Sequence, residues 1–178
     1  MSTGPTRTIV VLRHAKAEPH RPEDHGRHLA ERGRSNAPQA GRWLAGRGIA
    51  PDLALVSTAA RTRETWELAA AELPAPPEAV YDDRLYDADL DELITVLRET
   101  PDGAAEAVVV GHNPGMHGLA DYLAGACEPG LLPWLNASGF PTCAVAVLTF
   151  TGPWTSLDEG VARLVAYWTP REGDRSDA

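Results

Sequence analysis

The sequence predicts an α/β fold: a three-layer α/β/α sandwich whose mostly parallel central sheet has helices on both faces. Short apolar runs typical of buried strands alternate along the chain with segments of helical periodicity. A length of 178 residues and a hydrophobic content of 43% fit one globular domain, which we place at residues 1–169. The polar remainder, residues 170–178, is predicted to be a disordered tail.

In the first half of the chain we expect two buried strands, two helices and a short edge strand. The first helix lies within residues 31–47 and begins either at Glu31 or after Ser35, because Pro38 would remove an interior hydrogen bond from the longer version. Ser57 and Thr58 are candidate caps of the second helix. The expected segments are a strand at 8–12, a polar loop at 15–28, a strand at 53–56, a helix to about residue 72 and a strand near 80–81.

The second half continues the alternation. A helix begins at Asp89 or Asp91 and ends near Arg98. Asn113 is the expected N-cap of the next helix, with Pro114 at its first position. The helix that Asn113 caps is expected to end at Gly125. The remaining expected segments are a strand at 107–110, a long loop at 125–141 and strands at 143–150 and 161–168.

Charge and composition exclude several classes of function. The net charge of −9 disfavours nucleic acid or an anionic membrane as a partner. No apolar run is long enough to span a bilayer or to act as a signal peptide, and the two cysteines show no metal or redox spacing, so we expect a cytoplasmic protein. Residues 1–65 have a charge of +5 and residues 66–178 one of −14, which indicates either a local anion site or an uneven scatter of charge.

Two histidines follow core strands that are far apart in sequence. Arg13 and His14 end the first strand, and Gly111 and His112 end the strand at 107–110. Ligands of open α/β sheets bind beyond the carboxyl ends of the strands, so the two histidines are expected to meet there. Arg61, in the first turn of a helix that follows a third strand, would add positive charge. This combination suits a phosphate group.

The same four residues can transfer a phosphoryl group. Arginine binds two phosphoryl oxygens with its planar fork, and a neutral histidine can attack phosphorus to give a covalent intermediate. A second, protonated histidine can donate a hydrogen bond and balance charge. Arg13, His14, Arg61 and His112 match this set.

Three motifs in order resemble those of the histidine phosphatase (phosphoglycerate-mutase-like) superfamily, and the short chain resembles its SixA-type phosphohistidine phosphatases. The motifs are Leu12-Arg13-His14-Ala15, the segment from Ser57 to Thr65, and Gly111-His112-Asn113-Pro114. The resemblance implies that His14 is the phosphorylated nucleophile, that Arg13 and Arg61 clamp the phosphoryl oxygens, and that His112 completes the pocket. It further implies that no metal ion or other cofactor is needed and that the substrate-binding residues include Arg27 and Asn113.

The chain departs from this family in two places. Ala15 stands where a glycine often follows the nucleophile, which matters only if the backbone there requires a positive φ. Asp83, before Arg84-Leu85-Tyr86, stands where mutase-like relatives have a glutamate, and it is the candidate general acid. A weak general acid favours a good leaving group such as the imidazole of phosphohistidine over an alkoxide.

The expected function is therefore a metal-independent phosphatase that acts through phosphohistidine on a phosphorylated protein. Small phosphate esters (of sugars or nucleotides) and a catalytically inactive phosphate-binding protein remain alternatives, whereas no P-loop motif is present. The histidines and carboxylates of the 15–28 loop have no firm ligand geometry, so we expect no metal there; they are Glu18, His20, Glu23, Asp24, His25 and His28.

Overall fold

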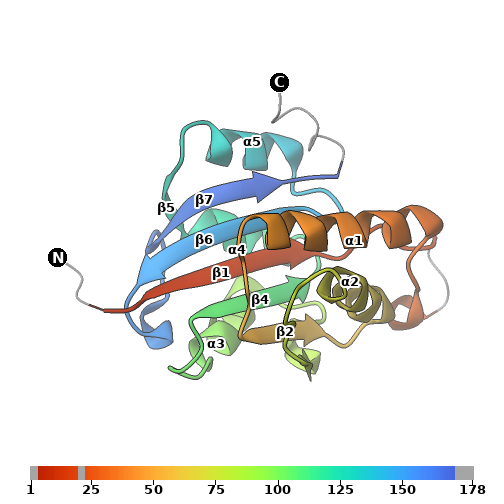
Figure 1. Cartoon of the computed structure of the whole chain (residues 1–178), viewed down its shortest axis with the longest axis horizontal. Helices are drawn as coiled ribbons and strands as arrows, with labels where there is room; N and C mark the ends of the chain where they lie inside the picture. The colour runs from red at the N-terminus through yellow and green to blue at the C-terminus, as the bar shows by residue number, and fades with distance from the viewer. Residues whose placement is uncertain (1–3, 20–22, 171–178) are drawn as a thin grey trace.

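A computed structural model of the chain, which describes residues 4–19 and 23–170, has one seven-stranded sheet between two layers of helices (Figure 1). The strand order is β3-β2-β4-β1-β6-β7-β5, and of these seven strands only β6 runs against the others. The sequence-based prediction of a mostly parallel α/β/α sandwich is confirmed. The predicted tail lies outside the described residues except for Pro170.

Strands and helices alternate through most of the chain, as the apolar periodicity predicts. The strands are β1 (Thr6–Arg13), β2 (Leu53–Ser57), β3 (Ala79–Asp82), β4 (Glu106–Gly111), β5 (Ala124–Cys127), β6 (Val145–Thr151) and β7 (Ala162–Trp168). The helices are α1 (Glu31–Gly46), α2 (Ala60–Ala70), α3 (Leu90–Arg98), α4 (Gly115–Leu123) and α5 (Leu131–Ser138), with short 3₁₀ turns at Asp24–Gly26, Asp83–Leu85 and Trp154–Ser156.

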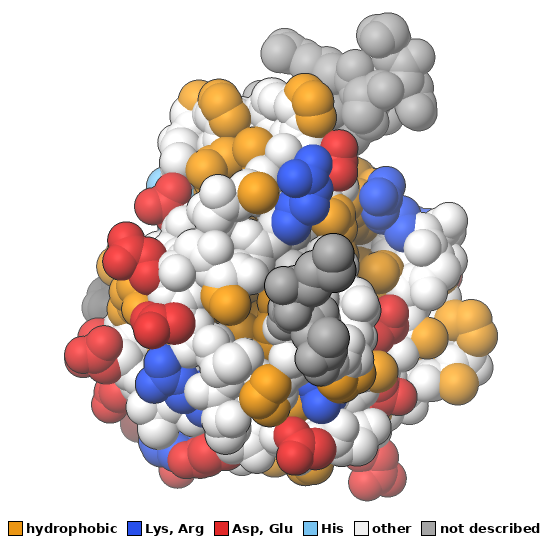
Figure 2. Space-filling view, turned by 90° about the vertical axis from the view of Figure 1, so that its left-hand side faces the viewer, with side chains coloured by type: hydrophobic (Ala, Val, Ile, Leu, Met, Phe, Trp, Pro, Cys, Tyr) orange, Lys and Arg blue, Asp and Glu red, His pale blue; other side chains and the backbone are white. Residues whose placement is uncertain are grey.

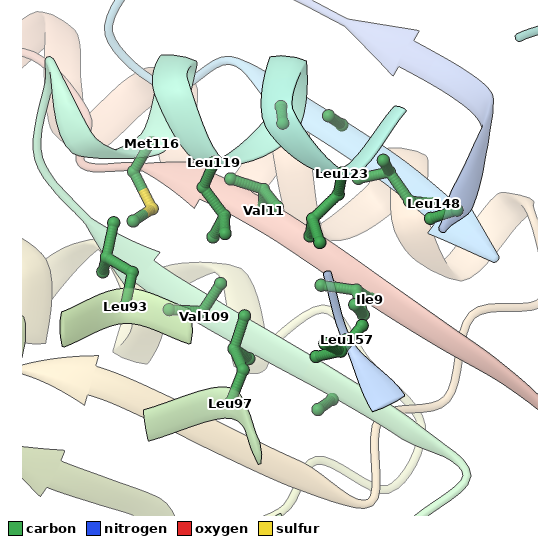
Figure 3. Close-up of a cluster of buried hydrophobic side chains, with 14 of the residues drawn as sticks. Ile9, Val11, Leu93, Leu97, Val109, Met116, Leu119, Leu123, Leu148 and Leu157 are labelled. Atoms are coloured by element: carbon green, nitrogen blue, oxygen red, sulfur yellow. The ribbon is translucent and has the colours of Figure 1, made fainter. Parts of the chain in front are cut away.

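Successive residues of β1 face opposite layers, which divides the core into two clusters. Ile9 and Val11 face α3 and α4, and Figure 3 shows Leu119 and Leu123 of α4 lying against them. Val10 and Leu12 belong to the other cluster, with α1 and α2. Because Ile9–Leu12, the centre of β1, is fully buried on both faces, the position of this strand in the molecule is strongly specified.

Two elements, β5 and α5, occupy parts of the segment 125–141, which the sequence analysis predicts to be a loop. β5 pairs in parallel with the edge of β7, and a Cβ on Gly125 would come within 1.9 Å of the Gly160 carbonyl oxygen. α5 lies between Gly130 and Gly139, which both have positive φ. Both elements are short, and the glycines and prolines in and around them usually mark turns, so local sequence signals missed them.

Helix starts also differ in part from expectation. α1 begins at Glu31 and contains Pro38, so the alternative start after Ser35 is wrong. Neither Ser57 nor Asn113 is the N-cap of its helix, because Ala59 and Pro114 take those positions. Asp89 does cap α3, in a reciprocal capping box with Glu92.

The face at the start of the parallel strands carries acidic, basic and hydrophobic side chains interspersed with one another (Figure 2). In the part of the chain that the structure describes, no helix combines the length and apolar character needed to cross a bilayer. The carboxyl ends of β1, β2 and β4 lie at the opposite end of the sheet and form the candidate site.

Candidate functional site

The sheet register brings the two predicted strand-end histidines together. Arg13 at the end of β1 pairs with Gly111 at the end of β4, so His14 and His112 follow the ends of adjacent strands. Their ring centroids are 5.3 Å apart. The His14 amide also donates to the Gly111 carbonyl at 3.0 Å, which continues the strand pairing into the site.

His14 is held as a neutral nucleophile. Its Nδ1 lies 2.7 Å from the Ala15 carbonyl oxygen, which can only accept, so Nδ1 carries the proton and Nε2 has a free lone pair. The side chain is only 8% exposed. Burial, together with nearby arginines that include Arg61, lowers the pKa of His14 to about 3. The ring is therefore unprotonated at neutral pH.

The backbone after His14 is held by α2. The Ala15 amide donates to Thr65 Oγ1 at 2.9 Å, and that hydroxyl donates to the Arg61 carbonyl at 2.6 Å. Among the described non-glycine residues, positive φ occurs at Asp87, Phe140 and Cys143 and not at Ala15, so alanine fits this position without strain.

His112 is oriented by a buried hydroxyl. Its Nε2 lies 2.8 Å from Ser57 Oγ, and Ser57 is fully buried at the end of β2. Burial, with the neighbouring His14 and Arg61, lowers the pKa of His112 to about 3. The free protein thus has a neutral His112, in contrast to the protonated histidine that the sequence analysis expects. A bound anion would raise this pKa by opposing the nearby positive charge.

Three buried polar nitrogens at this site have no hydrogen-bond partner among the described residues: Arg13 Nε, Arg61 Nε and His112 Nδ1. Buried polar nitrogens without a partner are costly, and a binding or catalytic role is one explanation for keeping them. Burial and the like charge of Arg61 also lower the pKa of Arg13. A concentration of positive charge with free donors is suited to an oxyanion.

Asp24 connects the arginines of the site. Its carboxylate accepts from Arg27 Nε at 2.9 Å, from Arg61 Nη2 at 3.1 Å and from the Tyr86 hydroxyl at 2.6 Å. The hydrogen bond from Tyr86 and the two arginines hold the pKa of Asp24 far below its ordinary value. Asp24 therefore stays ionised and positions both guanidinium groups.

The predicted loop 15–28 is fastened to α1 at its described ends. The Ala30 amide donates to the Lys16 carbonyl at 2.9 Å, and Ala17 and Leu29 form an isolated β-bridge. Gly33 in the first turns of α1 packs directly on this segment, since a Cβ there would lie 2.1 Å from the Lys16 carbonyl oxygen. The close approach fixes the chain that follows His14.

Six of the seven predicted site residues line one cavity of about 370 Å³. They are Arg13, His14, Arg27, Arg61, His112 and Asn113. The amide of Asn113 also donates to the carbonyls of Gly139 and Phe140 at 3.1 and 2.9 Å, which ties this cavity residue to the segment before Thr142, another residue of the wall.

Asp83, the expected general acid, is not brought to this cavity. It is exposed at the start of a 3₁₀ turn, and its neighbour Arg84 binds Asp82 and Glu99 instead of a substrate site. The turn directs Tyr86 and Asp87 toward the cavity. The Tyr86 hydroxyl donates a hydrogen bond to Asp24, and Asp87 lies in the cavity wall. The structure therefore places Asp83 apart from the other six predicted site residues.

The remaining polar residues of the 15–28 loop do not converge on a cation. His25 contacts Thr58 and His28 pairs with Glu64, while His20 lies outside the described residues. Over residues 4–19 and 23–170, no group of three or more His, Cys, Asp or Glu side chains is placed to hold a metal ion.

Sequence reasoning did not assign three charged residues to the cavity: Lys16, Asp24 and Asp87. Asp24 is treated there only as one polar loop residue, although its spacing of three from Arg27 could have suggested an ion pair. Lys16 and Asp87 also line the cavity. No local signal marks Asp87, whose φ of 55° is set by the turn into α3.

Sequence comparisons identify related proteins. A family model described as "Histidine phosphatase superfamily (branch 1)" matches residues 9–95. An uncharacterised protein of Mycobacterium leprae is 35% identical over 165 residues, covering 90% of this chain and 100% of its own. One from Mycobacterium tuberculosis is 38% identical over 162 residues, with the same coverage.

Solved structures share the complete fold. A candidate SixA phosphohistidine phosphatase from Nakamurella multipartitia has a TM-score of 0.81 and 30% identity, covering 96% of this chain and 99% of its own. Another from Agrobacterium tumefaciens has a TM-score of 0.78 and 31% identity, covering 94% and 100%. The protein histidine phosphatase SixA in complex with tungstate has a TM-score of 0.75 and 25% identity, covering 93% and 98%.

Proposed function

Because the chain belongs to the histidine phosphatase superfamily and is a phosphatase, we propose that it works without a metal ion, through a phosphorylated His14, on phosphohistidine in a protein. One observation carries the proposal: the free Nε2 lone pair of neutral His14 lies in the same cavity as three arginines and His112. A similar SixA structure binds tungstate, a tetrahedral oxyanion, which supports a phosphoryl site here.

The proposed reaction has two displacements at phosphorus. His14 Nε2 forms a bond to phosphorus while the bond to the leaving nitrogen breaks and its electron pair returns to that nitrogen. Water then attacks the phosphorylated His14, which releases inorganic phosphate and restores the neutral ring. Arg13, Arg61 and Arg27 bind the phosphoryl oxygens. Their fixed positive charge stabilises the negative charge of the transition state, as a metal ion does in other phosphoryl transfers.

His112 and Asn113 complete the proposed pocket. The negative charge of a bound phosphoryl group favours protonation of His112, which then donates a hydrogen bond to an oxygen. Asn113 lines the cavity and also holds the Gly139–Phe140 backbone, which lies just before the cavity residue Thr142. Because Asp83 lies outside this cavity, the pocket suits a leaving group that departs without strong acid assistance, as the imidazole of phosphohistidine does.

The test is the His14→Ala variant. We expect it to lose at least about a thousandfold in turnover of a phosphohistidine peptide, because it lacks the nucleophile, and to keep its circular dichroism spectrum. Wild-type protein mixed with substrate and quenched in alkali should show phosphate on His14, and EDTA should leave the rate unchanged. His117→Ala is the matched control, since His117 lies on α4 and contacts Asn136 outside the cavity.

Retention of most activity by His14→Ala would contradict the proposal. Turnover of sugar or nucleotide phosphates but not of the peptide would favour the small-ester alternative, and phosphate binding without any turnover would indicate a binding protein.

A further inference from the structure

A second cavity of about 290 Å³ adjoins the phosphate cavity. The two share three wall residues: Asp87, His112 and Asn113. A substrate whose phosphorus lies beside His14 can therefore extend its leaving group past His112 into the second cavity. A volume near the low end for ligand pockets matches one side chain better than a large sugar or nucleotide.

The walls of this adjoining cavity are apolar with an acidic margin. The apolar part comes from both helices that flank it, α3 and α4, and from the turn before α3; its residues are Leu85, Ala88, Leu93, Pro114 and Met116. The charged wall residues are Asp87 and Asp89, and no lysine or arginine is among the lining residues that the structure describes. Apolar walls suit a ring, and two carboxylates disfavour a leaving group that carries its own negative charge.

The two carboxylates are not equivalent. Asp89 accepts from the Glu92 amide at 2.9 Å and is committed to the cap of α3. Asp87 makes no hydrogen bond or ion pair with any described residue, and it belongs to the walls of both cavities. Its φ of 55° is a left-handed conformation that a non-glycine residue adopts at some cost. Asp87 is thus a free acceptor where the two cavities meet.

We propose that the adjoining cavity receives the imidazole of the substrate phosphohistidine and that Asp87 accepts a hydrogen bond from the ring nitrogen without phosphorus. This inference rests on the proposed function. A proton on that nitrogen, taken from solvent, makes the ring a cation, and the Asp87 carboxylate stabilises it. When the bond between phosphorus and the other nitrogen breaks, its electron pair neutralises the ring. Imidazole then leaves with no proton donor at the departing nitrogen.

The experiment compares two substrates, a phosphohistidine peptide and 4-nitrophenyl phosphate, whose leaving group has no ring N–H. We expect Asp87→Asn to lower the ratio of their kcat/KM values about tenfold, because a charge-assisted hydrogen bond becomes a weaker one. Asp91→Asn is the matched control: Asp91 is an exposed carboxylate on α3 outside both cavities, and its variant should keep the wild-type ratio. In a second variant, Ala88→Leu, the larger side chain should fill the cavity and raise KM for the peptide.

The outcomes separate the two proposals. An unchanged ratio in Asp87→Asn, with a wild-type protein active on the peptide, overturns the role of Asp87 and leaves the proposed function standing. A wild-type protein active on 4-nitrophenyl phosphate but not on the peptide overturns both. An unchanged KM in Ala88→Leu overturns the placement of the ring.

Discussion

Asp24 and Arg61 are joined twice: Arg61 Nη1 donates to the Asp24 carbonyl at 2.8 Å, and Nη2 donates to its carboxylate at 3.1 Å. Arg61 is 5% exposed, so this pair supplies the main counter-charge to a nearly buried guanidinium. A 3₁₀ turn 37 residues before the arginine thus sets the direction of its side chain.

The low pKa of Asp24 makes a prediction about acid stability. A carboxylate whose pKa is depressed by folding stabilises the protein above its unfolded pKa of about 3.8, and this contribution is lost as the pH falls below that value. The free energy of unfolding should therefore fall more steeply between pH 4 and pH 2 in the wild type than in Asp24→Asn. Urea denaturation at each pH measures it, and parallel curves would contradict the prediction. Asp91→Asn gives the effect of removing one remote negative charge.

The two buried histidines, His14 and His112, make the free energy of unfolding depend on pH over a higher range than Asp24 does. Their pKa values are about 3 in the folded protein and about 6.5 in an unfolded chain, so between these values the unfolded chain binds more protons. The free energy of unfolding should consequently decrease as the pH falls from 7 to 4, by up to about 1.4 kcal/mol per pH unit for each histidine. His112→Gln should show a shallower slope in urea denaturation. Equal slopes in the two proteins would show that His112 takes up a proton in the folded state.

Ser57 gives a test of ring orientation. Ser57→Ala removes the hydroxyl 2.8 Å from His112 Nε2 and leaves the ring without its partner. We expect kcat to fall about tenfold, which corresponds to the loss of one hydrogen bond of about 1.4 kcal/mol in the transition state. Steady-state kinetics with 4-nitrophenyl phosphate measures the change. Thr58→Ala is the control, since its hydroxyl contacts the exposed His25; an equal loss in both variants would argue against a specific role for Ser57.

Two glycines of α1 form a matched pair. At Gly33 a methyl group would collide with the Lys16 carbonyl, whereas at Gly46 it would meet nothing within 4 Å. Gly33→Ala should lower both the melting temperature and kcat/KM, because it displaces the segment after His14. Gly46→Ala should keep the activity and gain up to about 1 kcal/mol from helix propensity. Thermal denaturation measures the melting temperatures, and steady-state kinetics measures kcat/KM. A Gly33→Ala variant with wild-type values of both would show that the segment after His14 can shift without loss.

The central sheet could be predicted because its strands are uninterrupted apolar runs, such as Ile9–Leu12 and Ala107–Val110. Such runs are typical of parallel strands that are buried on both faces. The strand-end histidines could be found because parallel strands bring their carboxyl ends together. Asp24 and Asp87 could not, since their positions depend on turns whose conformation comes from tertiary contacts. Asp83 was misplaced for the same reason: one 3₁₀ turn sends it to the surface and its fourth neighbour to the cavity.

β1 and β4 are paired residue by residue from Thr8 and Glu106 to Arg13 and Gly111. The spacing of His14 and His112 is thereby a property of the main chain and not of the loops that surround them. The walls that would meet a leaving group come from other segments, chiefly the turn before α3 and the start of α4. Changes of sequence in those segments could give such a protein a new substrate while the distance between its two histidines stays the same.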